Sequence, residues 1–344
     1  MDTTCGSIVG ELDLKVPNLN IADLTGVTYF DSITYLDCSY NQLTSLPALP
    51  TVFLTTFVCS FNQLTSLPKL PHLLVSMSCT GNLLSKLPAL PLSLAYLDCG
   101  QNNLSSLPTL PASLIELYCY YNSLTYLPTL PDSLTTLRCS SNQINSLPTL
   151  PANMVHLLCD FNNLKSLPVP LPDSLTYLDC NNNELTTLPV LPIWLTSLYC
   201  QDNSITCLPK LDSSLSTLYA MGNQIACIPN LPIGLTPYGM DSTYQVCDSS
   251  NDVHGCLEKV VTTPATILPD LLLYPNPSTG IVNIISRYTM ADIRLIDVHG
   301  RVIFTQDNVN ISSAQFDISQ FAQGMYLVQI ISGGNVITKK LIIE

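Results

Sequence analysis

The chain is poor in charged residues and especially poor in basic ones. Only 11% of its 344 residues are charged, and 12 Lys and Arg stand against 25 Asp and Glu, which gives a net charge of −13. A protein that binds nucleic acid or an anionic membrane surface needs a basic footprint. The composition therefore argues against nucleic acid as a partner and against electrostatic attachment to a membrane.

Long apolar runs and familiar catalytic patterns are also missing. No stretch of about eighteen apolar residues occurs, so we expect no transmembrane segment. The first residues, "MDTTCGSIVGELDLKV", contain no basic region followed by an apolar one, so no signal peptide is visible. The patterns HExxH and GxSxG and the phosphate-binding P-loop are absent. We therefore expect neither an enzyme nor a cofactor.

What the sequence does contain is one segment copied about ten times. The copies share L-x-x-L-x-C-x-x-N-x-L-x-x-L-P-x-L-P, lie 20 or 21 residues apart, and include a tenth with Ala220 at the cysteine position. One copy cannot bury its apolar face alone, so successive copies must stack into a solenoid with a continuous core. The prolines remove two backbone donors per copy, which excludes a helix there and suits an extended, polyproline-like side.

This motif resembles the leucine-rich repeat, in the short bacterial form whose units carry LPxLP, over residues 33–240. The resemblance implies a leucine-rich-repeat solenoid with one short parallel β-strand per repeat on its concave face. We expect residues 1–32 to form an N-terminal cap or first irregular repeat. Residues 241–270 are expected to form a C-terminal cap and a linker, because terminal repeats must cover the open ends of the core.

Nine copies carry a cysteine at the same position, which raises four possibilities: a metal ladder, disulfides, a nucleophile or packing. An in-register row does not converge as tetrahedral metal ligands do, and parallel Cβ vectors would strain a disulfide. Nothing distinguishes one copy as a nucleophile. The position is that of an apolar residue in the repeat, so core packing is favoured and no metal is expected. These cysteines are Cys38, Cys59, Cys79, Cys99, Cys119, Cys139, Cys159, Cys180 and Cys200.

Five other cysteines lie outside this ladder. Cys207 and Cys227 occupy equivalent places on adjacent copies and could pair with each other. Cys247 and Cys256 flank "DSSNDVHG" and could close a short loop in the C-terminal cap. Cys5 has no evident partner.

An asparagine also recurs, three residues after each cysteine position. A buried amide has to be hydrogen-bonded, and stacked backbone groups at the bend can supply the partners. We therefore predict that the asparagines lock the turn of each unit.

The residues that vary between copies mark a candidate binding face. The resemblance implies that variable strand positions point outward on the concave side, where such arcs bind partners. Tyrosine and arginine are common in binding hot spots, and contiguous exposed aromatic residues indicate an interaction surface. The alternative is cross-strand stacking that only stabilises the sheet. The candidate ligand-binding residues are Tyr96, Tyr118, Tyr120, Tyr121, Arg138, His156, Leu158, Phe161, Tyr177, Tyr199 and Tyr219.

The last part of the chain has a different pattern. Short β-like runs separated by the turn signals "PNPSTG", "HG" and "SGGN" predict a small all-β, immunoglobulin-like sandwich. The ordered motifs "LYPNPSTG", "LIDVHGRVI", "DISQFAQGMYLVQI" and "TKKLIIE" resemble the type A C-terminal sorting domain of the type IX (Por) secretion system of Bacteroidota, over residues 271–344. The resemblance implies that this segment engages the type IX secretion machinery and that the protein is secreted or held at the outer cell surface.

Together these features predict a non-catalytic secreted or cell-surface protein, involved in binding or adhesion, whose concave face recognises a protein or glycan ligand. A structural spacer in a surface assembly is the alternative. The LPxLP repeats also resemble those of bacterial effector ubiquitin ligases, but those enzymes carry a separate helical catalytic domain for which this chain has no room.

Overall fold

The computed structural model describes residues 13–232, 235–237, 246–247, 256, 271–274, 276, 278, 280–290, 292–297, 300–307, 311–332 and 335–343. The chain divides into two compact units, Met1–Thr262 and Thr263–Glu344. Each unit is described by itself. Cys5 and most of the predicted cap and linker at residues 241–270 lie outside the described residues.

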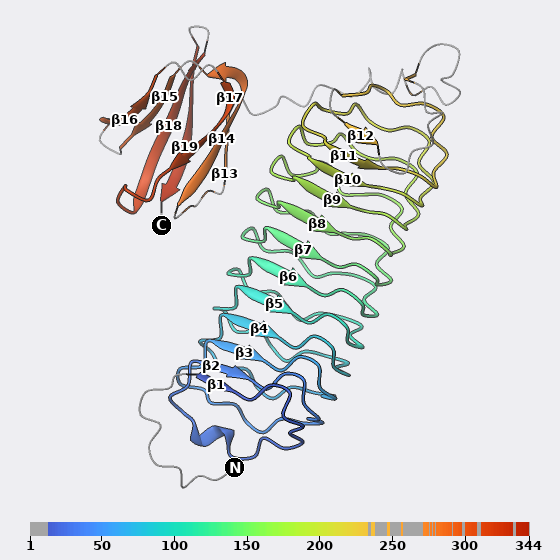
Figure 1. Cartoon of the computed structure of the whole chain (residues 1–344), viewed down its shortest axis with the longest axis vertical. Coiled ribbons are helices and arrows are strands. Elements are labelled where there is room, and N and C mark those ends of the chain that lie inside the picture. The colour runs from blue at the N-terminus through green and yellow to red at the C-terminus, as the bar shows by residue number, and fades with distance from the viewer. Residues whose placement is uncertain are drawn as a thin grey trace. The chain divides into compact units, whose positions relative to one another are not determined.

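A single parallel sheet of 12 strands runs along one side of the first unit (Figure 1). Each strand pairs with its neighbours in chain order, and a short 3-10 helix, Val27–Tyr29, precedes β2. The repeat thus places equivalent residues side by side, as where Tyr96 of one strand lies opposite Glu116 of the next. The strands are β1 (Asp13–Lys15), β2 (Tyr35–Asp37), β3 (Thr56–Val58), β4 (Ser76–Ser78), β5 (Tyr96–Asp98), β6 (Glu116–Tyr118), β7 (Thr136–Arg138), β8 (His156–Leu158), β9 (Tyr177–Asp179), β10 (Ser197–Tyr199), β11 (Thr217–Tyr219) and β12 (Thr236–Pro237).

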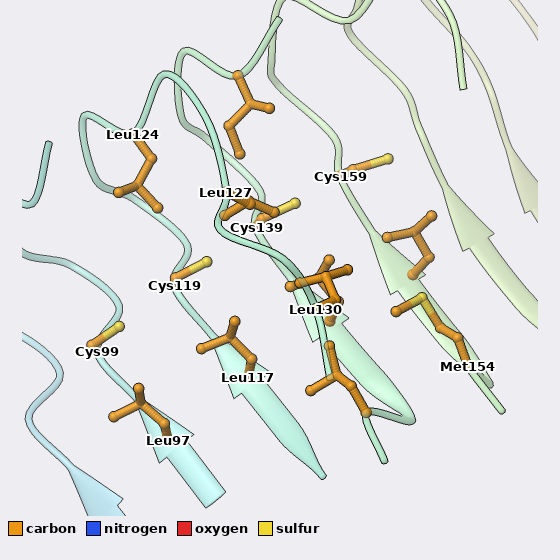
Figure 2. Close-up of a cluster of buried hydrophobic side chains, with 14 of the residues drawn as sticks. Leu97, Cys99, Leu117, Cys119, Leu124, Leu127, Leu130, Cys139, Met154 and Cys159 are labelled. Atoms are coloured by element: carbon orange, nitrogen blue, oxygen red, sulfur yellow. The ribbon is translucent and has the colours of Figure 1, made fainter. Parts of the chain in front are cut away.

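The core fills the space between these strands and the proline-rich connections. In one unit, Leu117 enters the core from β6 and Cys119 from just after it, and Leu124, Leu127 and Leu130 enter the core from the connection (Figure 2). All five side chains are buried. Burying one leucine contributes about 2 kcal/mol, so the repeated pattern stabilises the stack along its whole length.

The ladder cysteines belong to this core, as the core-packing interpretation of the repeat predicts. All nine are buried and unpaired, and Figure 2 shows Cys99, Cys119, Cys139 and Cys159 in a row. Burial raises the pKa of every one of these thiols, to about 12 at Cys139. No group of three or more His, Cys, Asp or Glu side chains that could hold a metal ion occurs among the described residues. The cysteines are therefore small, protonated, apolar packing groups.

The asparagine ladder locks the turns, as the sequence predicts. The side-chain Nδ2 of Asn102 donates hydrogen bonds to the carbonyls of Cys79 (3.0 Å), Cys99 (3.2 Å) and Gly100 (2.9 Å). Its Oδ1 accepts a hydrogen bond from the backbone N–H of Leu84 at 3.0 Å. One buried amide thus joins its own turn to the preceding unit, and the same bonds recur from Asn62 to Asn223.

The residue before each asparagine adopts a left-handed backbone conformation. Its φ lies between 49° and 69° in every unit from Tyr40 to Gly222. Glycine and asparagine enter this region most readily, and a bulky side chain there is uncommon. The position is nevertheless occupied by Tyr40, Phe61, Gly81, Gln101, Tyr121, Ser141, Phe161, Asn182, Asp202 and Gly222.

Two disulfides close the C-terminal end of the solenoid, with a pairing that the sequence did not predict. Cys207 bonds to Cys256 and Cys227 to Cys247, with Cα separations of 5.4 and 4.9 Å. The expected pairs, Cys207 with Cys227 and Cys247 with Cys256, are wrong. The chain returns over the last unit, where the N–H of Cys247 donates to the carbonyl of Ile228 at 2.8 Å. Each cysteine of the array therefore meets one from the returning segment, and the four sulfurs form a buried cluster.

The second unit is a small all-β domain built from two antiparallel sheets, as the turn signals predict. One sheet has the order β13 (Leu271–Tyr274), β14 (Ile281–Met290) and β17 (Ile311–Asp317). The other has the order β16 (Val302–Gln306), β15 (Asp292–Ile296), β18 (Gly324–Ser332) and β19 (Asn335–Ile343). Both sheets contribute to one core, with Val282 and Ile284 from the first and Leu295 and Val328 from the second.

Candidate binding site

The first group of candidate residues lies on β5 to β7 and the turns that follow them. The rings of Tyr96 and Tyr118 are 5.5 Å apart between centroids. The guanidinium of Arg138 lies 4.5 Å from the centroid of Tyr120, and Tyr120 meets Tyr121 edge to face at 6.0 Å. We call these five residues the central cluster. Their mutual contacts restrict the rings before any ligand arrives.

A glycine in the preceding unit makes room for Tyr120. A Cβ atom added at Gly100 would lie 2.6 Å from the Tyr120 ring, closer than real contacts allow. The ring therefore lies against the bare backbone of Gly100 on one side and meets Arg138 on the other. The missing side chain in one repeat thus fixes the position of an aromatic side chain in the next.

The second group of candidate residues follows β8 to β11. Successive ring centroids are 6.2 Å apart between His156 and Tyr177, 5.4 Å between Tyr177 and Tyr199, and 5.0 Å between Tyr199 and Tyr219. Tyr199 lies directly opposite Tyr219 in the register. We call these four residues the aromatic ladder. Stacking across strands stabilises the sheet and also holds the rings in fixed positions.

The remaining candidates are placed differently. Leu158 lies on β8 and is half-buried. Tyr121 and Phe161 are not on strands: both occupy the left-handed position of the turn, with 57% and 54% of their surface exposed. The turn also holds an aromatic pair that the sequence did not single out, Tyr40 and Phe61, whose rings stack at 4.6 Å. The turn therefore forms an aromatic rim beside the strands.

Carboxylates outside the list of candidate binding residues lie among the aromatic residues. Asp98 is opposite Tyr118 in the register, and Glu116 accepts a hydrogen bond from the Tyr118 hydroxyl at 2.7 Å. Asp179 is on β9, and Asp160 follows Cys159 in the unit before it. Asp98 is one of the positions that vary between copies, but the choice of candidates by residue type favoured tyrosine and arginine and left these carboxylates out.

Burial perturbs the titration of this face. It raises the pKa of Asp179 to about 6, with the charge of Asp160 as the second cause. Burial, followed by a nearby aspartate, raises the pKa of Tyr96 and of Tyr177 to about 12. At neutral pH Tyr96 and Tyr177 are thus neutral hydroxyl groups that can donate hydrogen bonds.

Comparison with known proteins identifies the second unit. Residues 272–344 match the family model of the secretion system C-terminal sorting domain, the tail of proteins exported by Por secretion. This unit is a type IX sorting domain. It marks the protein for secretion or for the outer cell surface. Within the described residues, none of the helices is long and apolar enough to cross a membrane. No curated protein matches the sequence.

Solved structures similar to the chain are leucine-rich repeat proteins. The functional domain of InlJ from Listeria monocytogenes, which includes a cysteine ladder, is 33% identical over 63% of this chain and 50% of its own, with a TM-score of 0.58. YopM from Yersinia enterocolitica is 32% identical over 65% of this chain and 58% of its own, with a TM-score of 0.49. FLRT2, in an octameric complex with Latrophilin 3 and Unc5D, is 19% identical over 67% and 84%, with a TM-score of 0.53.

The chain thus spans between half and three fifths of the length of InlJ and YopM. The parallel solenoid is a leucine-rich repeat fold, and the sorting domain follows it. The likeness to FLRT2 concerns the fold alone.

Proposed function

We propose that the protein, once exported, binds a protein ligand on the concave face of its solenoid and has no catalytic role of its own. The observation that carries the proposal is the central cluster. Its rings are half-buried or exposed, and their positions are set by Gly100, Arg138 and one another. Rigid, partly exposed tyrosines lose little entropy on binding and are frequent in hot spots.

The leucine-rich repeat fold and the chemistry of the central cluster favour a protein ligand over a glycan. The central cluster offers ring faces, hydroxyl groups and one guanidinium, which suit the mixed apolar and polar surface of a protein.

A spacer role is the competing function, and the aromatic ladder is the observation that favours it. The rings of Tyr199 and Tyr219 stack within 14° of parallel, which stabilises the sheet whether or not a ligand exists. Loss of binding on substitution of the central cluster separates the two functions, because a spacer has no saturable ligand there.

The test is binding of the full chain to a panel of purified extracellular proteins, with a glycan array beside it. We expect a saturable protein ligand whose affinity falls at least about tenfold in the double variant Tyr118→Ala and Tyr121→Ala. The matched control is Tyr126→Ala, an equally exposed tyrosine in the proline-rich connection. Equal affinity in the double variant and the control would refute the concave site.

A further inference from the structure

The basic residues of the solenoid lie mostly outside the strands, whereas acidic residues occur both on the strands and in the connections. Between residues 13 and 232, four of the six basic residues, namely Lys69, Lys86, Lys165 and Lys210, lie in the connections outside the strands. Arg138, on β7, is the basic residue found on strands β2 to β11 and at the positions directly after the ladder cysteines. The same positions carry five acidic residues: Asp37, Asp98, Glu116, Asp160 and Asp179.

The carboxylates of this face are satisfied by hydroxyl and amide donors and not by cations. Asp98 accepts from the N–H of Gly100 at 3.1 Å, and Asp160 accepts from the Ser140 hydroxyl. Within the described part of the solenoid, the ion pair with a nitrogen–oxygen distance under 4 Å is the one between Lys15 and Asp13 on β1, away from these carboxylates. Arg138 on β7 offsets part of this charge and favours the ionised form of Asp179, but four carboxylates on and beside β5 to β9 stand against this one cation, so the face keeps a net negative charge.

The protein itself shows how a cation fits on this face. The guanidinium of Arg138 lies 4.5 Å from the centroid of the Tyr120 ring, and the ammonium of Lys15 lies 5.0 Å from that of Tyr35. Both basic residues of the sheet thus stand over tyrosine rings. A cation over an aromatic face is attracted by the ring quadrupole, and more strongly when a carboxylate is near.

We propose that the concave face recognises a cationic protein segment, rich in lysine or arginine, which crosses β5 to β9 with its charges between the tyrosine rings and the carboxylates of Asp98, Glu116, Asp160 and Asp179. The proposal rests on the proposed function and specifies the class of its ligand. Complementary charge speeds association and rejects acidic partners, while the aromatic rings supply contact area. A net charge of −13 alone would attract cations to every side, so the test must separate this face from the rest.

The test compares two double variants of the full chain that have the same net charge. Asp98→Asn with Asp179→Asn removes two carboxylates from the concave face and keeps the oxygens that accept the turn N–H groups. Asp132→Asn with Asp173→Asn removes two exposed carboxylates from the connections. Each changes the net charge from −13 to −11, since two negative charges are removed (−13 + 2). The probes are a fluorescent lysine-rich peptide and a peptide in which every lysine is replaced by glutamate.

We expect the lysine-rich peptide to bind the native chain and the glutamate peptide not to bind. Affinity should fall about tenfold in the concave double variant, less than about twofold in the control, and steadily with added salt. Equal losses in the two double variants, or no binding of the lysine-rich peptide, would overturn the inference. A panel ligand that is lost on Tyr118→Ala and Tyr121→Ala but does not compete with the lysine-rich peptide would also overturn it, while leaving the concave binding site intact.

Discussion

The asparagine ladder gives the sharpest prediction about what holds the solenoid together. Asn102 is 7% exposed, and its amide makes four hydrogen bonds that reach Leu84, Cys79, Cys99 and Gly100. Replacing it with alanine leaves the N–H of Leu84 buried without an acceptor and takes a donor from three carbonyls. An orphaned buried donor costs about 1–3 kcal/mol. Because three carbonyls also lose a hydrogen-bond donor and a small cavity forms, we expect Asn102→Ala to lower the free energy of unfolding by about 3–4 kcal/mol.

A second substitution distinguishes hydrogen bonding from loss of volume. Asn102→Asp keeps the oxygen that accepts from Leu84 but turns the second oxygen, with its negative charge, toward the three carbonyls. A buried charge without a partner is expensive, so at pH 8 the aspartate variant should be less stable than the alanine variant. The difference should shrink as the pH falls and the carboxyl group is protonated.

The assay is urea denaturation of the full chain, followed by circular dichroism and by the fluorescence of Trp194, the single tryptophan. Asn103→Ala is the matched control, because the neighbouring asparagine is exposed and its loss should change stability by less than about 0.5 kcal/mol. A loss below about 1 kcal/mol in Asn102→Ala, or an aspartate variant more stable than the alanine variant at pH 8, would refute the reasoning.

Three further predictions follow from burial and close packing. The nine ladder thiols should resist alkylation in the native protein at pH 8 and react once urea unfolds it, because burial hides them and raises their pKa. Mass spectrometry counts the alkyl adducts, and rapid labelling of the native protein would contradict the register of the repeats. Asp179→Asn should raise stability by about 1–2 kcal/mol at pH 7–8. The native carboxyl, with a pKa of about 6, binds its proton more tightly than the unfolded one, so native stability falls as pH rises from about 4 to 6 and the gain should vanish below pH 4. A gain that is the same at every pH in urea titrations would show a different cause. Gly100→Ala should displace the Tyr120 ring and weaken ligand binding several-fold, with a loss of stability of about 1–2 kcal/mol; unchanged affinity would separate Tyr120 from the site.

Much of the solenoid could be predicted because each rule acts once per repeat. The period predicted the parallel register, and the position of Cys99 beside Leu97 predicted its place in the core. The hydrogen-bonding needs of a buried amide predicted the turn. These features are local and repeated, so a single unit contains the information for all of them.

The features that could not be predicted depend on contacts between distant or unlike segments. The disulfide of Cys207 with Cys256 requires the chain to return over the last unit, and nothing in the spacing of the cysteines reveals that path. The left-handed backbone at Tyr40 and Phe61 has no residue-type signal, because the turn around them imposes it. The strand positions of the sequence include the carboxylates of the concave face, but that Arg138 is the one cation near them on β5 to β9 appears only when the sheet is assembled.

The most direct test of the concave site is hydroxyl-radical footprinting of the full chain with and without the ligand identified in the panel. We expect Tyr118, Tyr120 and Tyr199 to lose reactivity when the ligand binds, while Tyr126 in the proline-rich connection keeps its reactivity. Protection of Tyr126 with unchanged reactivity at Tyr118 and Tyr120 would place the ligand on the opposite side of the solenoid and contradict the central claim.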